Sequence, residues 1–169
     1  MITKNLKGIN VEITIKVTDE FIEQRSANSK LYNQTGRTDR KFWMDLDCEI
    51  VEHTFIANGE WSAAEGWETD AVIDGKNVDL KFVQKYWNIS PRRIVNIIRQ
   101  RKIIDEYHFY EWVERPKRPL EPGDEVAVRF VGAMTYDQVA DNIKASYKQA
   151  GGHYVDIRSG LSNNNVMQT

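Results

Sequence analysis

Residues 69–83, TDAVIDGKNVDLKFV, place two aspartates and a lysine around a tight-turn dipeptide. Two short β-prone runs flank Asp74-Gly75, and this dipeptide between such runs is typical of a hairpin with a two-residue turn. With Asp74-Gly75 as the turn, Asp70 faces Asp79 across the hairpin. We therefore predict a β-hairpin over this segment.

The predicted register decides which side chains meet. It pairs Ile73 with Lys76, Val72 with Asn77, Ala71 with Val78, and Asp70 with Asp79. Directly opposed residues share a face, and so do alternate residues along one strand. Asp70, Asp79 and Lys81 are therefore expected to cluster.

This cluster suits the hydrolysis of a phosphodiester. Two close carboxylates repel each other, and Lys81 offsets only part of that repulsion. A divalent cation offsets the rest, and Mg²⁺ prefers carboxylate oxygens together with several waters. A metal polarises a phosphoryl oxygen and lowers the pKa of a bound water, while a lysine orients that water or stabilises developing charge. The alternative is that these residues are only the solvated face of a strand.

Other segments supply the elements that would position the cluster. Residues 9–17 alternate between apolar and polar side chains and predict a half-buried strand. Residues 41–57 predict one helix with Met44 and Phe55 on its apolar face, ended by Asn58-Gly59. Residues 24–40 are polar and weakly periodic, which indicates a loop or a helix that frays into one.

The rest of the chain predicts a mixture of strands and helices. We expect a short irregular strand in 60–68, a helix over 91–102, strands over 104–113 and 124–134, a helix from Thr135 to about 149, and a short strand in 153–157. Such an order indicates an α/β or α+β fold around a mixed sheet.

The hairpin segment resembles the PD-(D/E)XK nuclease superfamily. In that family an acidic residue begins or lies in one strand, and the next strand of a hairpin carries (D/E)-x-K. Here the matching positions are Asp70 and then Asp79-Leu80-Lys81. Thr69 stands where the pattern has proline, and Asp79 where glutamate is commoner. The segment DAVIDGKNVDLKF resembles the corresponding segment of small, phage-type members, which suggests a phage or prokaryotic source.

The resemblance implies a restriction-endonuclease-like fold, a central mixed β-sheet flanked by helices. Its core order is helix, three strands, helix, strand, usually with another strand or helix, and residues 41 to about 149 can be laid on that order. It also implies a Mg²⁺- or Mn²⁺-dependent deoxyribonuclease. Asp70 and Asp79 would hold the metal, with the carbonyl of Leu80 as a further ligand, and Lys81 would serve the chemical step.

Many members also carry a glutamate on the helix before the hairpin, and two residues compete for that role. At about 100° per residue, Glu52 lies about 70° from the apolar centre of its helix and Glu49 about 130°. A residue at the edge of the buried face can point along the sheet to the site. We therefore prefer Glu52 as a catalytic residue and metal ligand, directly or through water; the alternative is that both are surface glutamates.

Basic residues near an acidic metal site are what binding to a phosphate backbone requires. The candidates for contact with DNA are Lys85, Arg92, Arg93, Arg99 and Arg101. For each of them, a solvated helix face or loop is the alternative. With no second recognition domain in 169 residues, we expect cutting that is structure-directed or weakly sequence-specific.

Composition limits the setting. The net charge is -2 and Cys48 is the single cysteine, so the chain has no internal disulfide and any contact with DNA depends on local basic patches. No apolar run approaches the roughly 20 residues of a membrane span, and the N-terminus lacks a signal-peptide stretch. We expect a cytoplasmic protein without a membrane partner.

The expected organisation is a single nuclease-like domain over 1–158, with an N-terminal extension in 1–40 and a flexible tail in 159–169. Many small members of the family are dimers, so a homodimer is one expected assembly. Two other functions remain open at this point. One is a non-catalytic nucleic-acid-binding or assembly module of the same fold, and the other is a structural or interaction protein with surface acids.

Overall fold

The chain forms a mixed β-sheet flanked by helices. The computed structural model describes residues 2–4, 11–32, 40–65, 69–83, 88–89, 103–141 and 155–156. The predicted helix over 91–102 and the predicted tail over 159–169 lie outside these residues. Among the helices of the described part, none has the length and apolar character needed to cross a membrane.

Seven strands of the described part form the main sheet, in the order β1-β2-β8-β7-β5-β4-β3. Their bounds are β1 Ile2–Lys4, β2 Val11–Lys16, β3 Ser62–Ala63, β4 Ala71–Ile73, β5 Lys76–Phe82, β7 Glu106–Trp112 and β8 Glu125–Thr135. All neighbours are antiparallel except β5 and β7, which are parallel. β6 (Asn88–Ile89) and β9 (Val155–Asp156) form a separate antiparallel pair.

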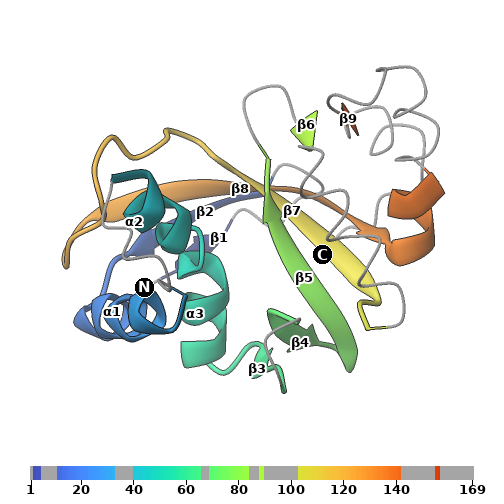
Figure 1. Cartoon of the computed structure of the whole chain (residues 1–169), viewed down its shortest axis with the longest axis horizontal. Helices are drawn as coiled ribbons and strands as arrows, with labels where there is room; N and C mark the ends of the chain where they lie inside the picture. Colours follow the sequence, from blue (N-terminus) through green and yellow to red (C-terminus); the bar gives the residue numbers. More distant parts are fainter. Residues whose placement is uncertain are drawn as a thin grey trace.

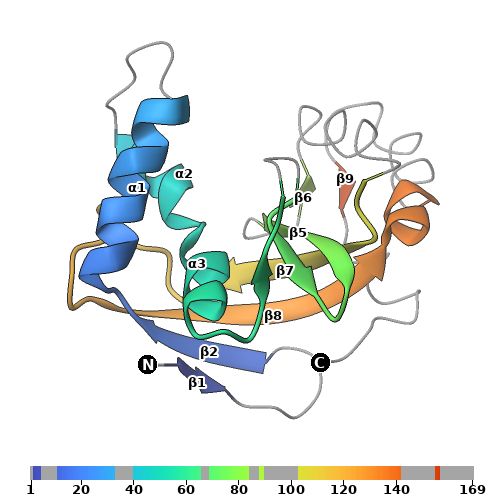
Figure 2. The ribbon, with the colours of Figure 1, turned by 90° about the horizontal axis from the view of Figure 1, so that it is seen from below.

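The predicted strands over 9–17, 104–113 and 124–134 are confirmed as β2, β7 and β8. In β2 the apolar residues Val11, Ile13 and Ile15 are buried, while the residues between them are exposed or half-buried. β2 pairs along its whole length with β8, and these two long strands form the floor on which the helices pack (Figures 1 and 2).

The helix predicted over 41–57 is divided into two. α2 covers Arg40–Asp47 and α3 covers Ile50–Ala57. At the break, the backbone N–H groups of Cys48 and Glu49 donate to carbonyls three residues back, at 3.3 Å and 3.0 Å. The prediction of a single helix was therefore wrong, although Asn58 caps the C-terminus of α3 as expected, with Gly59 at a positive φ of 78°.

α1 (Asp19–Tyr32) extends through residues 24–32, where a loop or fraying helix was expected. It begins at Thr18, whose hydroxyl accepts a hydrogen bond from the Phe21 N–H at 3.2 Å. Its later contacts are polar: Arg25 pairs with Asp47 of α2, and Asn28 bonds to Glu49. Because the contacts made after residue 24 are polar, this part of the helix has no apolar stripe that a sequence pattern could show.

The helices α1, α2 and α3 lie on the same side of β2 and β8, over one end of these strands (Figure 2). Ile50, Val51 and Phe55 of α3 enter a core with residues of β2, β7 and β8, and Leu80 and Phe82 of β5 pack against it. Because side chains alternate along a strand, Asp79 and Lys81 occupy the other face of β5.

At the opposite end of β8, residues 136–141 are helical (Figure 1). The Gln138 N–H donates to the Thr135 hydroxyl at 3.2 Å, and the Thr135 N–H donates to Oε1 of Gln138 at 2.9 Å. This reciprocal pair is a capping box, so the predicted helix start is confirmed.

Candidate active site

The hairpin forms, with three of the four predicted residue pairs; the fourth pair, Asp70 with Asp79, is not part of the ladder, because β4 begins at Ala71. Ala71 pairs with Val78, Val72 with Asn77 and Ile73 with Lys76. Asp74 and Gly75 make the turn with positive φ values of 51° and 76°. Both φ values are those of a two-residue turn that suits the twist of a hairpin. The turn chemistry thus sets which residues of β4 and β5 are opposed.

Asp70 immediately precedes β4 and is bound to β5 through its backbone and its side chain. Its N–H donates to the Val78 carbonyl at 3.1 Å, and its Oδ2 accepts from the Leu80 N–H at 2.7 Å. Burial and the neighbouring charge of Asp79 raise the pKa of Asp70 well above its usual range, more than the Leu80 bond and Lys81 lower it. The two carboxyl groups lie within hydrogen-bonding reach of each other.

Asp79 is buried in the middle of β5, with 5% of its surface exposed. The Nζ atom of Lys81 lies 2.6 Å from Asp79 Oδ2. This ion pair does not have the angles of a hydrogen bond, and Oδ2 of Asp79 has no other hydrogen-bond partner. The predicted clustering of Asp70, Asp79 and Lys81 is therefore present in the structure, with one ammonium against two carboxyl groups.

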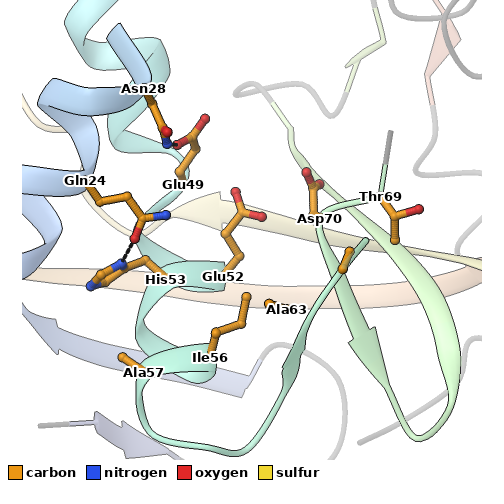
Figure 3. Close-up of a pocket in the computed structure, with 11 residues that line it drawn as sticks. Gln24, Asn28, Glu49, Glu52, His53, Ile56, Ala57, Ala63, Thr69 and Asp70 are labelled. Atoms are coloured by element: carbon orange, nitrogen blue, oxygen red, sulfur yellow. Dashed lines mark hydrogen bonds between the residues drawn. The ribbon is translucent and has the colours of Figure 1, made fainter. Parts of the chain in front are cut away.

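Glu52 of α3 faces Asp70, one member of this cluster, across a pocket of about 430 Å³ (Figure 3). Burial, followed by the charges of Asp70, Glu49 and Asp79, raises the pKa of Glu52 to about 10. The carboxyl groups of Glu52 and Asp70 come from facing walls of the pocket, one from α3 and the other from the start of β4 (Figure 3). Glu52 thus belongs to the same electrostatic cluster as the hairpin acids.

Glu49 lies at the break between α2 and α3 and is turned toward α1. Its Oε2 accepts a hydrogen bond from Nδ2 of Asn28 at 2.8 Å (Figure 3). Burial raises its pKa, against the lowering effect of the Asn28 bond. Of the two glutamates weighed from the sequence, Glu52 is the one whose pKa responds to both hairpin acids.

Two further polar residues line the pocket, and the sequence did not single them out. Gln24 of α1 contacts Nδ1 of His53 through its Oε1 (Figure 3). His53 packs its ring edge-on against Phe21, with centroids 5.5 Å apart. Gln24 could not be recognised from the sequence because residues 24–40 were expected to be irregular, so no helix face could be assigned to it or to Asn28, which also lines the pocket.

Tyr107 is a second neighbour that the sequence did not indicate. It is fully buried on β7, directly beside Asp79 in the parallel pairing of β5 with β7. Burial, followed by the charge of Asp79, raises the pKa of Tyr107. The Tyr107 phenol is therefore neutral, and Tyr107 lies beside Asp79 on the neighbouring strand.

The residues present fit a divalent cation in part. Asp70 and Asp79 supply two carboxyl groups that repel each other, and one buried oxygen of Asp79 has no hydrogen bond. Across the described residues, no three Asp, Glu, His or Cys side chains lie close enough together to hold a metal by themselves. A cation here would need backbone oxygen and water as well, which Mg²⁺ accepts.

The predicted DNA contacts lie outside the described residues. These are Lys85, Arg92, Arg93, Arg99 and Arg101. The structure therefore describes the acidic cluster and its pocket, and the predicted basic surface stays a prediction.

Comparisons with protein-family models, with curated proteins and with solved structures found no match to this chain. The functional argument consequently depends on the geometry of the site.

Proposed function

We propose that this chain is a Mg²⁺- or Mn²⁺-dependent nuclease that hydrolyses phosphodiester bonds of DNA, with a site of the PD-(D/E)XK type. The observation that carries the proposal is the grouping of Asp70, Asp79 and Lys81 by the β4–β5 hairpin. Two adjacent carboxyl groups, Asp79 buried and Asp70 half-buried, are unfavourable in their charged forms without a cation. A lysine against one of them suits a reaction in which negative charge develops at phosphate.

The arrangement of elements supports a restriction-endonuclease-like fold. α3, β3, β4 and β5 follow one another, and β7 and β8 come after the segment in which a helix was expected. This is the order helix, three strands, helix, strand and a further strand. The second helix of this order is the one predicted over 91–102, which lies outside the described residues. Asp70 stands at the start of the second of these strands, and Asp79 and Lys81 on the third.

Asp70 and Asp79 would hold the cation, with the carbonyl of Leu80 and, directly or through water, Glu52. A bound Mg²⁺ supplies a polarised phosphoryl oxygen and a water of lowered pKa. The Leu80 N–H holds the Asp70 carboxyl in place, which keeps one oxygen aimed at β5. Lys81 is 19% exposed, so its ammonium reaches solvent and can contact a phosphate or orient a water.

The test is Lys81→Ala in Mg²⁺ and in Mn²⁺, on linear duplex, single-stranded and branched DNA. We expect cleavage to fall roughly 10²–10⁴-fold, the usual effect of removing a positioned catalytic group. DNA binding should weaken only modestly, by one phosphate contact. Lys16→Ala, which removes an exposed lysine from β2, is the matched control and should cleave like the wild type.

Equal rates of cleavage by wild type and Lys81→Ala on all three substrates would refute the proposed nuclease function. If DNA binding then persists without cleavage in either protein, the chain is a nucleic-acid-binding module of the same fold. Asp79→Asn checks the same site independently, because it removes a carboxylate that the cation needs while it keeps the size of the side chain.

A further inference from the structure

The pocket beside the proposed site has its own chemistry. Its volume is about 430 Å³, within the range of small-ligand sites. Glu52 and Asp70 line it from facing sides, so any group inside it lies next to the proposed reaction centre. Ile56, Ala57, Ala63 and Ala64 contribute apolar surface, and α1 contributes amide groups.

The charge of the lining decides which part of a nucleic acid can enter. Glu49, Glu52 and Asp70 are acidic, and the described lining has no lysine or arginine. A phosphate group would therefore find no positively charged side chain to pair with in the described lining. A base is neutral, has flat apolar faces and carries hydrogen-bonding groups on its edge, which suits a lining of apolar and polar side chains.

The hydrogen bonds already made inside the pocket define what it offers to a base. Asn28 uses its NH₂ group on Glu49, so its carbonyl oxygen remains as an acceptor. Gln24 uses its carbonyl oxygen on His53, so its NH₂ group remains as a donor. These two residues are four apart on α1 and so lie on one face of the helix (Figure 3).

We infer that this pocket receives one unstacked base of the substrate, next to the phosphate that is cut, and favours bases with an exocyclic amino group. The inference rests on the proposed nuclease and narrows its substrate to DNA with an unpaired or terminal nucleotide. The carboxyl groups and the Asn28 carbonyl accept hydrogen bonds from an amino group of adenine, cytosine or guanine. Thymine has no amino group and presents carbonyl oxygens instead.

The experiment measures base binding without relying on cleavage. The side-chain amide NMR signals of Gln24 and Asn28 are followed while deoxyadenosine, deoxycytidine or thymidine is added at millimolar concentration. We expect both amides to shift with deoxyadenosine and deoxycytidine. Thymidine should bind roughly tenfold more weakly, the effect of about one hydrogen bond.

Variants locate the binding. Ala63→Phe fills the pocket from an exposed position, and Gln24→Leu keeps the volume but removes the donor. Both should weaken deoxyadenosine binding at least tenfold. Ser26→Ala lies on the exposed part of α1 away from the pocket, and should leave binding unchanged. Thermal unfolding of each variant shows that it is folded.

Three results would each overturn the inference. The first is thymidine binding as tight as that of deoxyadenosine, and the second is no shift of either amide with any nucleoside. The third is undiminished deoxyadenosine binding in both Ala63→Phe and Gln24→Leu. The two proposals can fail separately. If the wild type binds deoxyadenosine in this pocket but does not cleave DNA, the nuclease proposal is wrong. If it cleaves DNA but binds no nucleoside, the nuclease proposal holds and the proposal of a base pocket is wrong.

Discussion

At the scale of single residues, the site holds carboxyl groups whose charged form is disfavoured. Burial is the largest influence on Asp70 and on Glu52, and neighbouring carboxyl groups add to it. Their pKa values are therefore raised in the folded protein. A group with a raised pKa stabilises the fold fully below its unfolded pKa, near 4, and that contribution is lost as the pH rises toward the folded pKa.

Asp70→Asn tests this directly in the presence of a chelator. The amide oxygen of asparagine can still accept from the Leu80 N–H, but the side chain no longer ionises. Between pH 4 and pH 8 we expect the free energy of unfolding of the wild type to fall as the pH rises. The free energy of unfolding of the variant should fall less steeply, with a slope that differs from that of the wild type by up to about 1.4 kcal/mol per pH unit. Urea unfolding across this pH range is the measurement.

Asp45→Asn provides the control, because Asp45 is an exposed residue of α2. Its pH profile should follow that of the wild type. If Asp70→Asn has the same slope as the wild type, the Asp70 carboxyl does not carry the expected charge penalty.

At the scale of elements, the hairpin turn is the feature that positions the site. Gly75 has a φ of 76°, and a Cβ added there would meet no atom within 4 Å. The expected effect of Gly75→Ala is therefore backbone strain alone, which lowers the free energy of unfolding by about 1–2 kcal/mol. Asp74→Asn should change it little, because asparagine tolerates a positive φ. Urea unfolding compares the two, and equal stability of Gly75→Ala and wild type would contradict the turn geometry.

The same hairpin shows which elements can be predicted. A two-residue turn of Asp-Gly between β-prone runs is a local signal, and the register follows from it without any tertiary contact. The break between α2 and α3 has no comparable signal. Asp47, the last residue of α2, is bound by Arg25 of α1 and by the Leu120 N–H of the connector before β8. Both partners are far away in the sequence, so periodicity could not reveal the break.

At the scale of the whole molecule, Asp47 connects segments that are distant in the chain. It is 1% exposed, with Oδ1 at 2.6 Å from Nη1 of Arg25 and Oδ2 at 2.9 Å from the Leu120 nitrogen. Burial raises the pKa of Asp47, despite the lowering effect of both partners. Arg25 also donates to the Leu120 carbonyl and lies over the Trp43 ring.

Asp47→Ala should lower the free energy of unfolding by about 3 kcal/mol, because the half-buried Arg25 charge would lose its carboxylate and the Leu120 N–H would lose its acceptor. Thermal or urea unfolding measures the loss. Arg118→Ala is the control, since Arg118 pairs with Asp124 at the exposed surface and should matter far less. A loss in Asp47→Ala no larger than that in Arg118→Ala would show that the buried pair does not hold these segments together.

A divalent cation should stabilise the whole fold through the proposed site. At a Mg²⁺ concentration about 100 times the dissociation constant, the expected gain in the free energy of unfolding is about 2.7 kcal/mol. The free energy of unfolding measured in Mg²⁺ should therefore exceed that measured in a chelator for the wild type, but the two values should be equal for Asp79→Asn. Asp45→Asn should respond like the wild type. Equal stabilisation of wild type and Asp79→Asn would remove Asp79 from the metal site.

The sequence by itself determined the hairpin, the pairing of residues 71–73 with residues 76–78, and the shared face of Asp79 and Lys81. These depend on the turn dipeptide and on the alternation of side chains along a strand, and both are local. It also determined strands β2, β7 and β8, β2 from its alternating apolar residues and β7 from its aromatic, β-prone composition.

Only the tertiary structure decided how far α1 extends, where α2 ends, and that Gln24, Asn28 and Glu49 line a pocket with Glu52. These features depend on polar contacts between α1, α2, α3 and the start of β4. A polar pair formed across the fold has no period and no fixed spacing in sequence. It exists only when the packing of the core brings the two side chains together.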